Sequence, residues 1–228
     1  MAQILNCAEL QKVLHLPDCD GRRGLYLAID GPDGIGKSTL VTFAAKALKR
    51  SGREVIVRSE PERNGPLWRT IRDHRLSGKY SDEVWLLILI AASLASQSRH
   101  NTTPDPRSVG VWILTDRSPM AAFAHYWQSV DTCLRDALIS RFVPPDALIW
   151  LRPKGPDLLR RRLHERREAE EHVYETLAEG RNYDDVAVWL KRRGWPIITV
   201  DATESATTEA LWHEVLKRVS SLPLRKLA

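Results

Sequence analysis

The sequence predicts an α/β protein built on a five-stranded parallel sheet with helices on both faces. Three observations support this fold class. Short apolar runs alternate with longer helical segments from residue 25 onward. Four of the five runs lead into charged residues or a glycine-rich turn, as strands of such sheets do at their carboxyl ends. The chain has 228 residues, 43% of them hydrophobic, which suffices for one core but not for two full domains.

The elements follow from local patterns taken in chain order. Strands are expected where short β-prone apolar runs occur, at 25–29, 54–58, 111–115, 147–151 and 197–200. Helices are expected at 8–16, 37–51, 66–76, 82–97, 119–130, 131–141, 155–171 and 209–220. The helix that starts at Lys37 should stop at Ser51-Gly52, which is a common helix-ending pair.

A phosphate-loop pattern follows the first expected strand. It reads Gly31-x4-Gly36-Lys37-Ser38. In this pattern backbone N–H groups surround phosphate oxygens, the lysine reaches the β- and γ-phosphates, and the serine hydroxyl holds Mg2+. The start of the next helix adds its dipole. We therefore expect a nucleoside triphosphate site, with Lys37 facing solvent when no nucleotide is bound; a glycine-rich turn without a ligand is the alternative.

The net charge of +5 does not by itself indicate a nucleic-acid partner. Residues 152–167 hold seven basic and two acidic side chains, a local excess of five, so the rest of the chain is neutral on balance. A short basic helix serves triphosphate chemistry as well as it serves a polymer backbone.

Cysteine usage and hydropathy place the chain in a reducing cytoplasm. Cys7, Cys19 and Cys133 are odd in number and lack any C-x-x-C spacing, so neither a disulfide framework nor a zinc site is expected. Residues 1–24 have no apolar signal core, and the most apolar run, 84–92, is shorter than the roughly 20 residues of a membrane span. No membrane association is expected.

An acidic residue ends the third expected strand. Asp116 is followed by Arg117 and Ser118. An aspartate at this position commonly contacts Mg2+ or its waters in phosphate-loop proteins. The structural alternative is a helix cap, which Pro119 just downstream would also suit.

At these positions the chain resembles the thymidylate kinases, within the nucleoside monophosphate kinase group. The resemblance rests on the loop 31–39, on Arg58-Ser-Glu60-Pro61, on Asp116-Arg117 and on Val200-Asp-Ala-Thr203. It covers about residues 25–222 and implies the three-layer P-loop kinase fold. Residues 25–228 would then form the kinase domain, with a lid near 155–171, and 1–24 an N-terminal extension.

The resemblance implies transfer of the γ-phosphoryl group of ATP to the 5′-phosphate of a nucleotide acceptor, with Mg2+ as cofactor. The implied catalytic residues are Asp33, Lys37, Asp116, Arg117 and the lid arginines Arg166 and Arg167. The implied ATP contacts are Gly31, Gly34, Ile35, Gly36, Lys37, Ser38, Thr39, Arg162, Ala202 and Thr203, and the implied metal contacts are Ser38 and Asp116. The implied acceptor contacts are Asp33, Glu60, Arg63, Arg72, Ile90, Leu94 and Arg117. For the basic helix, a solvated face with ordinary Glu–Arg pairs is the alternative to a lid.

Two departures from the family pattern concern the acceptor. Ser118 stands where the family has an aromatic residue. In the helix that reads the base, Ile90-Ala-Ala-Ser93-Leu94 stands where the family has an aromatic residue followed by Ala-Ala-Asp-Arg. Strict thymine specificity is therefore not expected. The apolar helix 84–97 is expected to be covered by a second subunit, as in the dimeric members of the family.

Two other functions stay open at this point. Deoxynucleoside kinases also place a glutamate after the second strand, so Glu60 could be the general base for a hydroxyl acceptor, either a nucleoside or a hydroxymethyl base in DNA. DNA is a partner only under that hypothesis. A nucleotide-binding protein without catalytic activity is the second alternative.

Overall fold

The computed structural model describes residues 24–61, 80–100, 105–166 and 170–222. Its strands are β1 (Tyr26–Asp30), β2 (Val55–Ser59), β3 (Trp112–Asp116), β4 (Ala147–Pro153) and β5 (Ile197–Ala202). Its α-helices are α2 (Lys37–Arg50), α4 (Asp82–His100), α5 (Pro119–His125), α6 (Thr132–Ile139), α7 (Pro156–Glu165), α8 (Glu170–Arg192) and α9 (Thr208–Val219). Two short 3-10 helices, Pro106–Val109 and Trp127–Ser129, complete the described elements.

All strand pairs are parallel, and the strand order is β2-β3-β1-β4-β5. The central strand β1 pairs with β3 on one side and with β4 on the other. In this register Asp116 at the end of β3 lies opposite both Ile29 and Ser59. The segments that follow β1, β2 and β3 therefore leave the sheet at the same edge, where ligands of such sheets bind.

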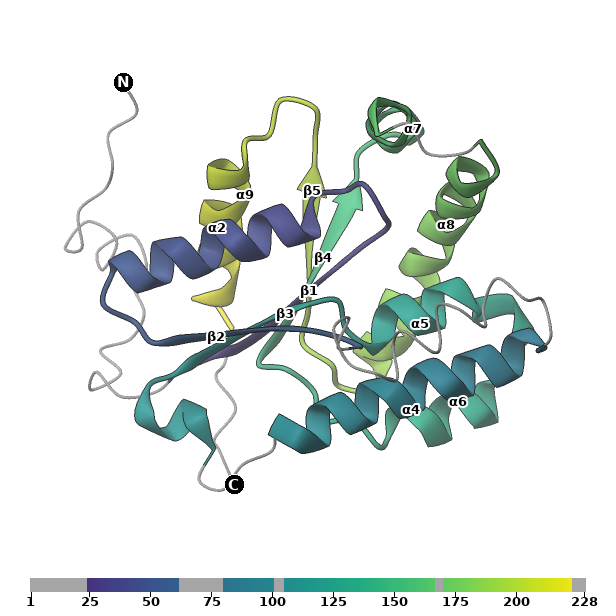
Figure 1. Ribbon diagram of the computed structural model, residues 1–228, viewed down its shortest axis with the longest axis horizontal. Helices are drawn as coiled ribbons and strands as arrows, with labels where there is room; N and C mark the ends of the chain where they lie inside the picture. Colours follow the sequence, from purple (N-terminus) through teal and green to yellow (C-terminus); the bar gives the residue numbers. More distant parts are fainter. Residues whose placement is uncertain (1–23, 62–79, 101–104, 167–169, 223–228) are drawn as a thin grey trace.

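Helices cover both faces of the sheet (Figure 1), and an apolar core between the helices and the strands holds the layers together on each face. Helices α2 and α9 pack on one face, where Leu40 and Trp212 are buried against the strands. Helices α4, α5, α6 and α8 pack on the other face, around Phe123 and Tyr183. Burying one large apolar side chain contributes roughly 1.5–3 kcal/mol, so the two-sided burial of the strands favours this layering. The predicted five-stranded parallel sheet with helices on both faces is confirmed.

Two of the predicted helices differ most from the structure. The expected helix 119–130 ends at His125 and continues as the 3-10 turn Trp127–Ser129. The expected helix 155–171 ends at Glu165, and a long helix that the sequence reading missed, α8, begins at Glu170. Its buried residues Tyr183, Val186, Ala187 and Leu190 have helical spacing, which was the available signal.

Several predictions fall on residues outside the described part of the chain. These are the helices expected at 8–16 and 66–76 and the arginines Arg63, Arg72 and Arg167. Among the described helices, none combines the length and the apolar character that crossing a membrane requires.

Candidate active site

The phosphate loop connects β1 to α2 and is formed by backbone that glycine favours. Gly31, Gly34 and Gly36 have φ values of 147°, 80° and 104°. Space is also limited at two of them: a Cβ on Gly31 would lie 2.6 Å from the carbonyl oxygen of Leu151, and one on Gly34 would lie 3.2 Å from the Leu163 side chain. The loop is therefore enclosed by β4 and α7, and it leads directly into the N-terminus of α2.

Lys37 does not face solvent, which corrects the sequence expectation. Its side chain is 5% exposed, and its Nζ donates to the carbonyl oxygens of Gly31 at 2.7 Å and Pro32 at 2.8 Å. It also contacts Oδ1 of Asp33 at 3.3 Å. The loop's own oxygens thus bind the ammonium group in this structure. Burial, aided by the charge of Arg117, lowers the pKa of Lys37, while the neighbouring carboxylates oppose that shift.

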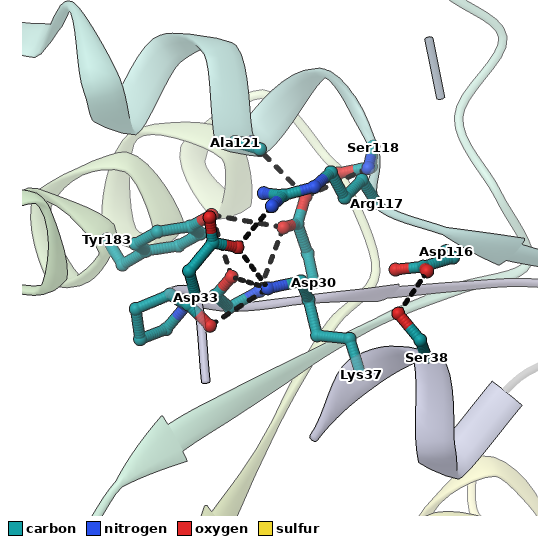
Figure 2. Close-up of polar contacts among 11 residues, drawn as sticks. Asp30, Asp33, Lys37, Ser38, Asp116, Arg117, Ser118, Ala121 and Tyr183 are labelled. Atoms are coloured by element: carbon teal, nitrogen blue, oxygen red, sulfur yellow. Dashed lines mark hydrogen bonds and ion pairs between the residues drawn. The ribbon is translucent and has the colours of Figure 1, made fainter. Parts of the chain in front are cut away.

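Asp33 links the phosphate loop to the residue after β3. Its Oδ1 accepts from Lys37 and also forms an ion pair with Arg117 (Figure 2). Burial raises the pKa of Asp33, but the charges of Arg117 and Lys37 outweigh burial and hold this pKa below its usual range. Two cations from two loops therefore meet at one carboxylate, and phosphate groups could replace that carboxylate.

Arg117 has an unusual backbone. Its φ is 80°, in the left-handed region that non-glycine residues rarely adopt. Its N–H donates to the carbonyl oxygen of Ile29 at 2.9 Å. Such conformations persist only where surrounding structure enforces them, and they cluster at functional sites.

Ser38 and Asp116 form an oxygen-rich pair at the start of α2. The Ser38 hydroxyl donates to Oδ2 of Asp116 at 2.5 Å. Hydroxyl and carboxylate oxygens suit Mg2+, which is usually held by one or two protein ligands together with waters and substrate phosphates. No group of three or more His, Cys, Asp or Glu residues that could hold a metal occurs within the described ranges. The Ser38–Asp116 pair matches the Mg2+ sites in which the protein supplies only one or two ligands. The cap of α5 is Ser118, whose hydroxyl accepts from Met120 N, so Asp116 is not the helix cap.

Helix α7 contacts the phosphate loop through Arg162. Its Nη1 donates to the carbonyl oxygen of Ile35 at 2.8 Å. The adjacent Arg161 instead pairs with Glu204, in the segment after β5, at 2.7 Å, and approaches Glu165 at 3.7 Å. Arg160 is exposed, and Arg166 is exposed at the end of the helix. Arg162 is therefore the α7 arginine that contacts the phosphate loop in this structure.

The segment that follows β5 contacts α7 through the Arg161–Glu204 ion pair. Ala202 is fully buried, and its carbonyl oxygen accepts from Lys154 N at 2.9 Å. The Thr203 hydroxyl lies 3.4 Å from that of Ser205. The loop, α7 and residues 202–205 are thus joined by the contacts of Arg161 and Arg162.

Two of the acceptor candidates, Glu60 and Ile90, are buried in this structure, and Leu94 is half-buried. Glu60 is 4% exposed, and burial raises its pKa to about 8, although Gln97 and Arg58 partly oppose the shift. Ile90 is 1% exposed and belongs to the core between α4 and the sheet. Leu94 is half-buried and packs against the same core. Ile90 therefore contributes to packing in this structure, and Leu94 has the more accessible side chain.

Sequence reasoning did not single out two residues that the structure places at the centre of this site. Asp30 ends β1 and is fully buried, and the Tyr183 hydroxyl from α8 lies 3.1 Å from it (Figure 2). The available signal for Asp30 was a charged residue closing an otherwise apolar strand. The position of Tyr183 could not be read from local sequence, because the helix that carries it was not predicted.

The fold and the loop together define a phosphate-loop α/β protein of the nucleotide-binding class. Comparison with known families agrees, since the thymidylate kinase family model matches residues 29–212. The chain belongs to the thymidylate kinase family.

Thymidylate kinases from several organisms align with this chain over different lengths. A thymidylate kinase of Synechococcus sp. is 28% identical over 82% of this chain and 95% of its own length. Those of Thiobacillus denitrificans and Akkermansia muciniphila are 34% and 32% identical, over 45% and 57% of this chain. These two alignments span 48% and 63% of the relatives' own lengths.

Proposed function

We propose that the protein transfers the γ-phosphoryl group of ATP to the 5′-phosphate of a deoxynucleoside monophosphate. The observation that carries the proposal is the shared contact of Lys37 and Arg117 with Asp33. This contact brings two cations together: Lys37, which suits the donor phosphates, and Arg117, which suits an acceptor phosphate. Family membership supports the same reaction.

Charge and position suffice for this chemistry. An acceptor phosphate, with a second pKa near ~6, is already a charged nucleophile at neutral pH, so no general base is required. The donor phosphates would take over the Nζ of Lys37 from the Gly31 and Pro32 carbonyl oxygens. The acceptor phosphate would take over the guanidinium of Arg117 from Asp33. Asp33 is then free to contact the acceptor sugar, the role that the family resemblance assigns to it.

Mg2+ would be held by Ser38 and Asp116, whose side chains already lie together beside the loop. When bound, the ion would neutralise charge on the donor phosphates. Arg162 would keep α7 against the loop and so help to exclude water from the transferring group.

A hydroxyl acceptor is the second candidate, and the state of Glu60 disfavours it. A hydroxyl acceptor needs a base that can take its proton. With a pKa of about 8, Glu60 is mostly protonated at neutral pH, so only a minor fraction of the molecules would carry the ionised base. The nucleoside kinase and DNA-base kinase alternatives are less favoured for that reason, and family membership also supports a phosphate acceptor.

We propose that the protein has low specificity for the base of the acceptor nucleotide. Leu94 is the half-buried side chain at a position where the resembled family has an arginine, and an apolar contact separates bases by only roughly 1–3 kcal/mol per small group. Thymidylate is the first acceptor to test, because the relatives are thymidylate kinases.

A homodimer is proposed through the outer face of α4. Val84 and Leu87 are 37% and 42% exposed, and Ala91 and Ala95 continue the same helical stripe. The opposite face of this helix is buried in the core through Trp85, Leu86 and Ile90. An apolar stripe on a helix whose other face is already packed fits a second copy of the chain.

Release of ADP from ATP, measured with a panel of deoxynucleoside monophosphates with and without Mg2+, tests the reaction directly. We expect turnover that requires both an acceptor and Mg2+. ADP release that is equal with and without every acceptor would overturn the proposed reaction, and tight ATP binding without turnover would indicate a non-catalytic binding protein.

A further inference from the structure

Asp30 is a fully buried carboxylate between the phosphate loop and the segment after β3. Its Oδ1 accepts from Gly31 N at 2.8 Å and lies 3.1 Å from the Tyr183 hydroxyl. Its Oδ2 accepts from the backbone N–H and the hydroxyl of Ser118, at 2.9 and 2.6 Å, and from Ala121 N at 3.2 Å. Figure 2 shows these contacts converging on the one side chain.

Each of these groups can donate a hydrogen bond, so the arrangement favours an ionised carboxylate. Burial raises the pKa of Asp30, while Ser118 and the charges of Lys37 and Arg117 oppose that shift. An amide in the same place could not satisfy the Gly31 and Ser118 N–H groups together. One of its two ends is an NH2 group that would face a donor.

The groups that Asp30 binds come from three separate parts of the proposed site. Gly31 opens the phosphate loop. Ser118 directly follows Arg117, the residue with the left-handed backbone, and donates its own N–H to Asp30. Tyr183 lies on α8, the helix that follows α7 in the chain, and its hydroxyl also lies 3.0 Å from the Gly31 carbonyl oxygen.

We propose that Asp30 is a positioning residue that fixes the Arg117 turn relative to the phosphate loop; this inference rests on the proposed phosphoryl transfer. Donor and acceptor phosphates must lie in line for transfer. Each loop can bind its own phosphate without Asp30. Because the acceptor phosphate would take Arg117 away from Asp33, the Asp30 carboxylate is the side chain that would still join the two loops during transfer. A displacement near 1 Å can cost about 10²-fold in rate.

Asp30→Asn tests this role, with ATP and thymidine 5′-monophosphate as the substrates. We expect kcat to fall about 10²-fold while the KM of each substrate changes less than about threefold, since each loop survives but their alignment does not. Asp146→Asn is the matched control. Asp146 is a buried carboxylate that accepts from Tyr26 N and Arg107 Nη1 at the opposite end of the sheet, and its variant should keep wild-type kcat.

Ser118→Ala is the second variant, in case Asp30→Asn does not fold. It removes one hydrogen bond to Asp30 and the cap of α5 but keeps the backbone contact, so kcat should fall about tenfold with KM values unchanged. Asp131→Ala removes the comparable cap of α6 and should leave kcat unchanged.

The outcomes separate this inference from the proposed function. If the wild type does not phosphorylate any deoxynucleoside monophosphate, both are wrong. If the wild type is active and Asp30→Asn keeps kcat within threefold, only the positioning role is wrong. Equal losses in Asp30→Asn and Asp146→Asn would also overturn it, because they would indicate a general effect of removing a buried charge.

Discussion

Arg162 donates from Nη1 to the carbonyl oxygen of Ile35 at 2.8 Å, so helix α7 is attached to the backbone of the phosphate loop. Leu163, the next residue, occupies the space that a side chain on Gly34 would need. Glycine at position 34 lets α7 approach the loop closely, and Arg162 on α7 then binds the loop backbone.

Arg162→Ala should reduce kcat more than any other single arginine change on the described part of α7. We expect a loss of about 10²-fold in kcat with a smaller change in the KM for ATP, because α7 would no longer be held against the loop around the transferring group. Arg160→Ala, at an exposed position on the same helix, is the control and should keep wild-type kinetics. Equal kinetics for the two variants would remove Arg162 from the site.

Lys37→Ala should give a folded protein with almost no phosphoryl transfer. Removing a cation from the donor phosphates should cost about 10²–10³-fold or more in kcat. The carbonyl oxygens of Gly31 and Pro32 also lose their buried donor, so we expect Tm to fall while the protein still folds at 25 °C. Lys46→Ala, an exposed lysine on the same helix, controls for loss of charge. Activity within tenfold of the wild type would contradict the assignment.

The buried carboxyl of Glu60 should make stability depend on pH. Its pKa is raised from 4.5 to about 8, so between these values the unfolded chain releases a proton that the folded protein retains. The free energy of unfolding should therefore fall as pH rises through this window, by at most about 1.4 kcal/mol per pH unit. The Glu60→Gln variant should not show this decline. The free energy of unfolding of the variant minus that of the wild type, measured by urea unfolding, should therefore be larger at pH 8 than at pH 5. Parallel pH profiles for the two proteins would be inconsistent with a protonated Glu60.

The proposed dimer interface can be tested by placing a charge on α4. Leu87→Glu should convert a dimer into a monomer in sedimentation velocity experiments, because a carboxylate would be buried at the centre of the apolar stripe. Val188→Glu is the matched control, since Val188 is 49% exposed on α8, away from that stripe. A wild-type protein that stays monomeric at all accessible concentrations would contradict the interface.

The layers of the fold could be predicted because each depends on local pattern. The five strand-like runs and the phosphate loop lie in continuous sequence, and the structure has strands in the expected places. Helix α8 was missed because charged residues and Gly180 interrupt its apolar pattern. A helical spacing of apolar residues is left only in its C-terminal half, from Tyr183 to Leu190.

The site was only partly predictable, because some of its contacts join distant residues. Lys37 was expected to face solvent, since sequence does not show that the carbonyl oxygens of Gly31 and Pro32 turn toward it. The contact between Asp30 and Tyr183 spans 153 residues and could not be read from any local motif. Phosphate-loop residues follow from a motif, whereas the residues that align two loops follow from tertiary structure.

The most direct test of the central claim compares phosphate and hydroxyl acceptors in the wild type and in Glu60→Gln. ADP release would be measured with thymidine 5′-monophosphate, the other deoxynucleoside monophosphates and the matching nucleosides. We predict turnover with monophosphates only, a weak preference among bases, and a modest effect of Glu60→Gln, because no proton has to be removed before attack. Turnover with a nucleoside, together with a loss of about 10²–10⁴-fold in Glu60→Gln, would contradict the monophosphate kinase account.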